Sequence, residues 1–159
     1  MFKYGYKGYQ KATGSKPAPG GAGSAFNEIA SGEGVHRLNE NPEAVLIDVR
    51  TSAEHKYVGF PENSILIPWF DEPDLNSDPS AFCEAVNNHL SDRSDILGTE
   101  LILICRSGFR SNEALKCLQS NGFTCVSHVA SGFEGDLDEN DHRGNLNGWR
   151  NDGMPWSQG

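Results

Sequence analysis

The chain has 159 residues, of which 36% are hydrophobic, and a formal net charge of −9. This length suffices for one folded domain with a core of its own. An acidic chain, with a pI near 4.9, repels phosphate backbones, so nucleic-acid binding is excluded as the expected main activity. Its apolar runs are far shorter than the roughly 20 residues that cross a bilayer, so no membrane partner is expected either.

The first 23 residues are rich in Gly, Pro, Lys and Tyr, and no periodic apolar pattern runs through them. This composition predicts a flexible tail over residues 1–23, followed by one folded domain over residues 24–159. The N-terminus lacks the apolar stretch of a secretory signal, so we expect a cytoplasmic protein. In that compartment the four cysteines are expected to remain free thiols.

Four short apolar runs, rich in branched side chains, have the length and composition of buried strands. They are residues 44–49, 64–68, 101–104 and 124–129. A short extra strand is expected around Val35 and Leu38. The sequence therefore predicts a sheet of four to five strands.

Helices are predicted before and between these strands. Asp78 is a typical N-cap followed by a proline, and apolar residues then recur every four positions, which indicates a helix over residues 79–90. A second helix is expected over residues 111–121, before Gly122, and a short one over residues 24–31. Strands that alternate with helices indicate an α/β fold, in which a central parallel sheet carries helices on both faces.

The segment after the third strand joins a cysteine to groups that favour an anion. Cys105 follows residues 101–104 directly, at the carboxyl end of a strand, where open α/β sheets bind ligands. Gly108 permits a tight curl whose N–H groups converge on one point, and the next helix adds its positive end. Arg106 and Arg110 supply two cations. A thiol in this loop ionises easily, so we predict that Cys105 is a nucleophile rather than a plain buried cysteine.

Three motifs, in this order, resemble the signatures of the rhodanese homology domain from about residue 24 to the end. The active-site loop of single-domain rhodaneses is similar to Cys105-Arg106-Ser107-Gly108-Phe109-Arg110-Ser111. The family's first signature is similar to residues 46–50 with Glu54 and Gly59, and its closing signature to residues 132–135 with Trp149 and residues 153–156. The chain departs from the family at residues 59–64, where Gly-Phe-Pro-Glu-Asn-Ser replaces the usual Gly-His-Ile-Pro-Gly-Ala.

The resemblance implies a rhodanese-like fold and a thiosulfate sulfurtransferase. Cys105 would attack the sulfane sulfur of thiosulfate or of a persulfide, become a persulfide itself, and pass the sulfur to cyanide, a thiol or a protein cysteine. The loop N–H groups from Arg106 to Ser111 would hold the anionic charge, and Arg106 and Arg110 would attract the anionic donor. No metal or organic cofactor is implied.

Asp48 and Arg50 are candidate supporting residues. They are candidates for a catalytic carboxylate and cation. Asp48 ends a strand near the same sheet edge as Cys105, so it is also a candidate to order the active-site loop, but a buried ion pair with Arg50 is the favoured role. Glu54 is expected to face solvent or to cap a helix. No histidine lies close to Cys105 in the sequence, so no Cys–His dyad is indicated.

Two other functions remain open. Cell-cycle phosphatases and some arsenate reductases share the rhodanese fold, but cysteine phosphatases use a C-x5-R loop to wrap a phosphate. Arg110 is the fifth residue after Cys105, so this loop is C-x4-R and one residue shorter. A non-catalytic binding module is the other alternative, and the presence of Cys105 argues against it. A redox role for Cys117 or Cys125 also remains open, although a packed position is the favoured interpretation.

Overall fold

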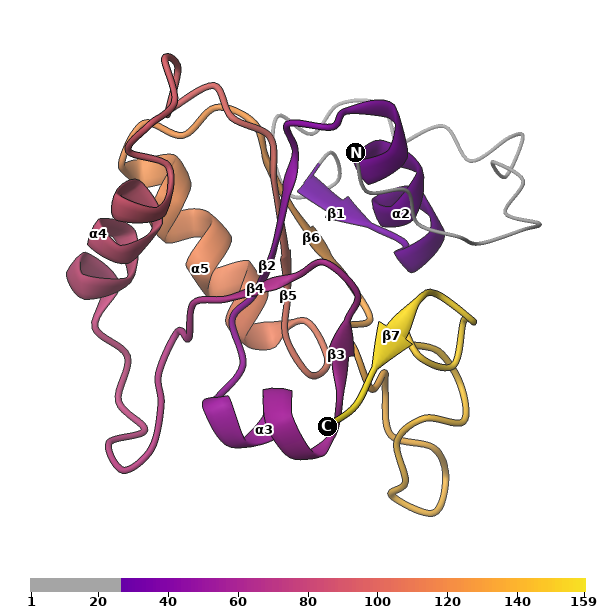
Figure 1. Ribbon diagram of the computed structural model, residues 1–159. Coiled ribbons are helices and arrows are strands. Elements are labelled where there is room, and N and C mark those ends of the chain that lie inside the picture. Colours follow the sequence, from indigo (N-terminus) through magenta and orange to yellow (C-terminus); the bar gives the residue numbers. More distant parts are fainter. Residues whose placement is uncertain (1–26) are drawn as a thin grey trace.

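A parallel sheet of five strands forms the centre of the molecule (Figure 1). The computed structural model describes residues 27–159, so the predicted tail over residues 1–23 lies outside the described part. The strand order is β1 (Glu28–Ile29), β6 (Val126–Val129), β5 (Leu101–Ile104), β2 (Val45–Asp48) and β4 (Ile65–Leu66), and neighbouring strands are parallel. The predicted parallel sheet is confirmed, and β5, the strand before Cys105, lies at its centre.

Helices cover both faces of the sheet, as predicted (Figure 1). On one face pack α4 (Pro79–His89) and α5 (Phe109–Ser120), whose apolar side chains share a core with Leu103 of β5. On the other face packs α2 (Ser31–Glu40), which shares a second core with Ile102 of β5. Because side chains alternate along a strand, β5 contributes to both cores. Within residues 27–159, no helix is long and apolar enough to cross a membrane.

The segment before β2 differs from the sequence-based prediction. A helix over residues 24–31 is wrong for Glu28 and Ile29, which form β1 and pair with β6. A strand around Val35 and Leu38 is also wrong, because both residues lie in α2 and point into the second core. Apolar residues three positions apart fit a helical face, and here that periodicity outweighs local strand propensity.

Two glycines explain why the sequence does not predict α2. Gly32 and Gly34 both lie in the first turn, where glycine lowers helix propensity. Gly34 has a packing role, because a Cβ at this position would lie 3.4 Å from the ring of Trp149, which is fully buried. The helix therefore approaches the C-terminal part of the chain closely, at a cost in its own intrinsic stability.

Three short elements near the active-site loop are absent from the sequence-based prediction. α3 (Ser52–Tyr57) buries none of its side chains, so no apolar pattern indicates it. β3 (Phe60–Pro61) pairs in antiparallel fashion with β7 (Trp156–Ser157), which brings the end of the chain beside the connection after α3 (Figure 1). Phe60 and Pro61 stand where the sequence departs from the family's first signature, so the unusual residues here form a sheet edge.

Candidate functional site

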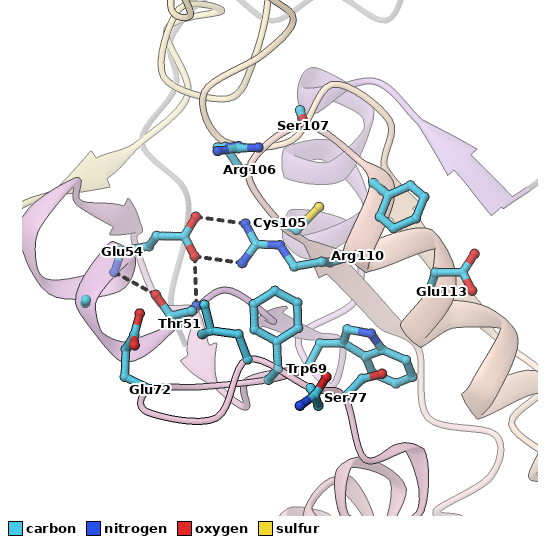
Figure 2. A pocket seen from close by; sticks show the side chains of 15 residues that line it. Thr51, Glu54, Trp69, Glu72, Ser77, Cys105, Arg106, Ser107, Arg110 and Glu113 are labelled. Carbon is cyan, nitrogen blue, oxygen red and sulfur yellow. Dashed lines mark hydrogen bonds and ion pairs between the residues drawn. The ribbon is translucent and has the colours of Figure 1, made fainter.

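Cys105 borders a pocket of about 920 Å³ at the carboxyl end of β5 (Figure 2). Its side chain is almost fully buried, with 1% exposed. Four of the other predicted loop residues reach the same pocket: Arg106, Ser107, Phe109 and Arg110. The opposite wall comes from α3 and from the connection between β4 and α4, and includes Thr51, Glu54, Trp69, Phe70, Glu72 and Leu75.

The loop curls at Gly108, as its sequence suggests. Gly108 has a left-handed backbone, with φ of 106°, and its N–H group donates a hydrogen bond to Cys105 Sγ at 3.1 Å. A side chain here would overlap the carbonyl oxygen of Ala130, so only glycine fits. α5 begins at Phe109, earlier than the predicted start at residue 111, so its unpaired first-turn N–H groups belong to the same loop.

Ser111 and His128 form a buried polar chain behind Cys105. Ser111 Oγ lies 3.3 Å from Cys105 Sγ and 2.8 Å from His128 Nδ1. On the far side, His128 Nε2 lies 3.5 Å from a carboxylate oxygen of Glu28, beyond good hydrogen-bonding geometry. Burial lowers the pKa of His128, and the negative charge of Glu28 opposes this shift in part. The sequence does not indicate this series of polar side chains, because β5 and β6 become neighbours only in the folded sheet.

Arg110 is held by Glu54 rather than left free. Its guanidinium makes two hydrogen bonds to the Glu54 carboxylate, of 2.7 and 2.8 Å, and lies over the ring of Phe70 (Figure 2). Glu54 also forms a capping box with Thr51 at the start of α3, which confirms the expected helix cap. Burial alone would raise the pKa of Glu54, but hydrogen bonds from Arg110 and Thr51 outweigh it and lower this pKa to about 2.

Asp48 and Arg50 form the expected ion pair, and both side chains are fully buried. Arg50 Nε and Nη2 donate to the two Asp48 carboxylate oxygens at 2.9 and 2.7 Å, and His55 Nδ1 lies 2.8 Å from the same carboxylate. Burial would raise the pKa of Asp48, but hydrogen bonds from His55 and Arg50 lower it. The Arg50 guanidinium packs on the ring of Phe133 at 4.4 Å. Neither residue lines the pocket, and the expected role of Asp48 in ordering the loop stays a prediction.

The turn over residues 132–135 binds the backbone of the Cys105 loop. The N–H groups of Phe133 and Glu134 donate to the carbonyl oxygens of Cys105 and Arg106, at 2.8 and 2.9 Å. A Cβ at Gly132 would overlap the carbonyl group of Arg106, and Gly132 has φ of 68°. Residues 132–135 of the closing signature therefore hold the Cys105 loop in place, a role that their residue types alone do not reveal.

Comparisons with known proteins agree with this geometry. Residues 31–139 match the family model of the Rhodanese-like domain. An uncharacterized protein of Rickettsia prowazekii is 30% identical over 80% of this chain and 94% of its own length. The thiosulfate:glutathione sulfurtransferase of Saccharomyces cerevisiae is 35% identical over 55% of this chain and 60% of its own. The crystal structure of Rv0390 from M. tuberculosis is similar with a TM-score of 0.69 and 36% identity, over 83% of this chain and 97% of that one.

Proposed function

The chain belongs to the rhodanese-like domain family, and from this premise we propose that it is a sulfurtransferase with Cys105 as the nucleophile. The observation that carries the proposal is the position of Cys105 Sγ, which accepts a hydrogen bond from Gly108 N–H at the edge of a pocket. A sulfur held in this way can carry negative charge, first as a thiolate and then as a persulfide.

The reaction proceeds in two displacements. The thiolate attacks the sulfane sulfur of thiosulfate or of a persulfide, and the donor's S–S bond breaks, so that its electron pair leaves with sulfite or with a thiolate. Cys105 then carries the sulfur as Cys–S–S⁻. An acceptor thiolate or cyanide attacks this outer sulfur, and the electron pair of the broken bond returns to Cys105.

The loop supplies the electrostatics of both steps. Gly108 N–H and the first-turn N–H groups of α5 stabilise the negative charge on sulfur, and Arg106, an exposed cation of the pocket, attracts an anionic donor. The pocket of about 920 Å³ has room for a donor and for part of a thiol or protein-cysteine acceptor. No cofactor enters this reaction. All four cysteines are free thiols, which fits the reducing cytoplasm that we propose as the compartment.

Arg110 weighs against the phosphatase alternative. A phosphatase arginine has to direct its guanidinium at the phosphate oxygens, whereas both hydrogen-bonding edges used here go to the Glu54 carboxylate. The engagement of Arg110 by Glu54 therefore supports sulfur transfer over phosphate hydrolysis.

Intact-mass analysis after incubation with thiosulfate tests the proposal. We expect the parent protein to gain one sulfur atom that dithiothreitol removes, and the Cys105→Ser variant to gain none. Cys125→Ser is the matched control, because it removes an exposed thiol away from the pocket and should behave like the parent. A parent protein that takes up no sulfur from thiosulfate or from a persulfide donor would refute the proposal.

A further inference from the structure

We propose that His128 takes up and returns the proton of Cys105, acting through the hydroxyl group of Ser111. His128 does not touch the reacting sulfur, so it is a positioning residue for the proton rather than a catalytic residue. Its place in the reaction rests on the proposed sulfurtransferase function, whereas the test below needs no sulfur donor.

Geometry carries the first part of this proposal. Cys105, Ser111 and His128 are in series, with all three side chains buried and with spacings of 3.3 and 2.8 Å. Buried polar groups at such distances exchange hydrogen bonds with each other, because water does not reach them. These three side chains run from the pocket to β1, where His128 Nε2 lies without a hydrogen bond among the described residues.

Ser111 has a single hydroxyl proton, and the protonation state of His128 Nδ1 decides which neighbouring group receives it. Ser111 Oγ lies near three groups that can accept it: Cys105 Sγ, His128 Nδ1 and the carbonyl oxygen of Gly108 at 3.2 Å. When His128 Nδ1 is unprotonated, it accepts the Ser111 proton, and Ser111 Oγ accepts the S–H group of Cys105. When Nδ1 carries a proton, it donates to Ser111 Oγ, and the hydroxyl proton turns to the sulfur.

The proton transfer that links these two states is balanced. As Cys105 attacks the donor, its S–H proton moves to Ser111 Oγ while the Ser111 proton moves to His128 Nδ1. The products are a sulfur nucleophile, an unchanged hydroxyl group and an imidazolium. In the second displacement, the electron pair returns to Cys105 Sγ and the two protons move back, so no other acid or base is consumed.

The surroundings of His128 act on its two protonation states in opposite ways. Two charged groups face the chain: Glu28 from β1, beside Nε2, and Arg110 from α5, whose charge acts on Cys105. From β5, Leu103 is the strand partner of His128 and contributes no charge. Burial lowers the pKa of His128, which keeps the resting imidazole neutral but makes the transient imidazolium less stable. Glu28 then partly compensates the imidazolium charge.

The pH dependence of Cys105 alkylation by iodoacetamide tests the proposal, with the modified site identified by peptide mass. In His128→Asn, the amide keeps a hydrogen-bonding group near Ser111 but cannot take up a proton. We expect its alkylation rate to be about tenfold below the parent at pH 6.5 and to approach the parent by pH 9.5, where solvent removes the thiol proton. Ser127→Ala is the matched control on β6, because its buried hydroxyl lacks a hydrogen bond within residues 27–159.

Two further variants distinguish a loss of proton transfer from a general loss of structure. Ser111→Ala removes the hydroxyl group that links His128 to Cys105, so adding His128→Asn to this variant should cause no further loss of the alkylation rate. Glu28→Gln changes a half-exposed side chain, and should shift the pH profile in the same direction by a smaller amount. A rate ratio between His128→Asn and the parent that stays constant with pH, or losses that multiply in the double variant, would overturn the relay. A protein that alkylates as expected but accepts no sulfur would instead refute only the proposed function.

Discussion

The floor and the rim of the Cys105 pocket are held in different ways. The floor is the supporting layer behind the Cys105 loop, and its residues do not themselves line the pocket. It consists of the turn over residues 132–135, which binds the loop through backbone hydrogen bonds, and the buried ion pair of Asp48 and Arg50, which contacts this turn at Phe133. The rim consists of residues 70–77 and Phe109, most of which are exposed, Phe109 by 77%. The position of Cys105 therefore depends on the fold, whereas the exposed rim can vary at little cost in stability.

The largest effect is expected from breaking the ion pair of the floor. In Arg50→Met, the buried carboxylate of Asp48 loses its main partner, and we expect the free energy of unfolding to fall by about 3–5 kcal/mol. Urea unfolding measures this change. The double variant Asp48→Asn/Arg50→Met should lose clearly less than the sum of the single losses, because it leaves no unpaired charge. A loss below about 1 kcal/mol in Arg50→Met would show that the pair is not needed.

The next effect concerns the contact between the turn and the loop. Gly132→Ala places a methyl group against the Arg106 carbonyl, so we expect a loss of about 1–3 kcal/mol together with slower alkylation of Cys105. Gly144→Ala is the matched control, because Gly144 also has a positive φ, of 86°, but its Cβ would lie 3.6 Å from Arg150 Nη2, an ordinary van der Waals contact. If the two variants were equally reactive at Cys105, the turn would not be holding the loop.

Glu54 joins α3 to Arg110 of the Cys105 loop, and the effect of this ion pair on stability depends on pH. Its pKa of about 2 in the folded protein lies below the ordinary value of 4.5, so its stabilising contribution is full above pH 4.5 and is lost as the pH falls toward 2. In Glu54→Gln, the free energy of unfolding should therefore decline less steeply across this pH range. Denaturation from pH 7 to 2 measures the slope, with Glu72→Gln on the exposed rim as the control. Parallel curves for Glu54→Gln and the parent would contradict the pairing with Arg110.

The smallest effect on stability is expected at the rim itself. Phe109→Ser and Leu75→Ser remove exposed apolar side chains, so each should change the free energy of unfolding by less than about 0.5 kcal/mol. Formation of the Cys105 persulfide should be unchanged, while KM for a bulky thiol acceptor rises several-fold. Single-turnover persulfide formation and steady-state transfer separate the two effects. A large loss of stability would mean that the rim is as fixed as the floor.

The sequence predicts the sheet and the glycine turn of the Cys105 loop well because both depend on local patterns. β5 has the predicted bounds, and Cys105 with its glycine turn follows it directly in the chain. α2 is hidden by glycines that serve a distant contact with Trp149, and α3 has no buried face to produce a periodic pattern.

The missing parts of the site depend on contacts across the fold. His128 reaches Ser111 only because β6 lies beside β5, and Glu54 reaches Arg110 from another element. The only local signal at Glu54 was the Thr51-x-x-Glu54 capping box, which indicates a helix start but not the ion pair.

Transfer from isolated persulfide tests the central claim most directly. The protein is loaded with thiosulfate, freed of excess donor, and incubated with cyanide, and the thiocyanate released is measured together with the protein mass. We predict one thiocyanate for each protein, a return to the starting mass, and no release from Cys105→Ser treated in the same way. Sulfur that stays on the protein, or equal release from Cys105→Ser, would contradict the account.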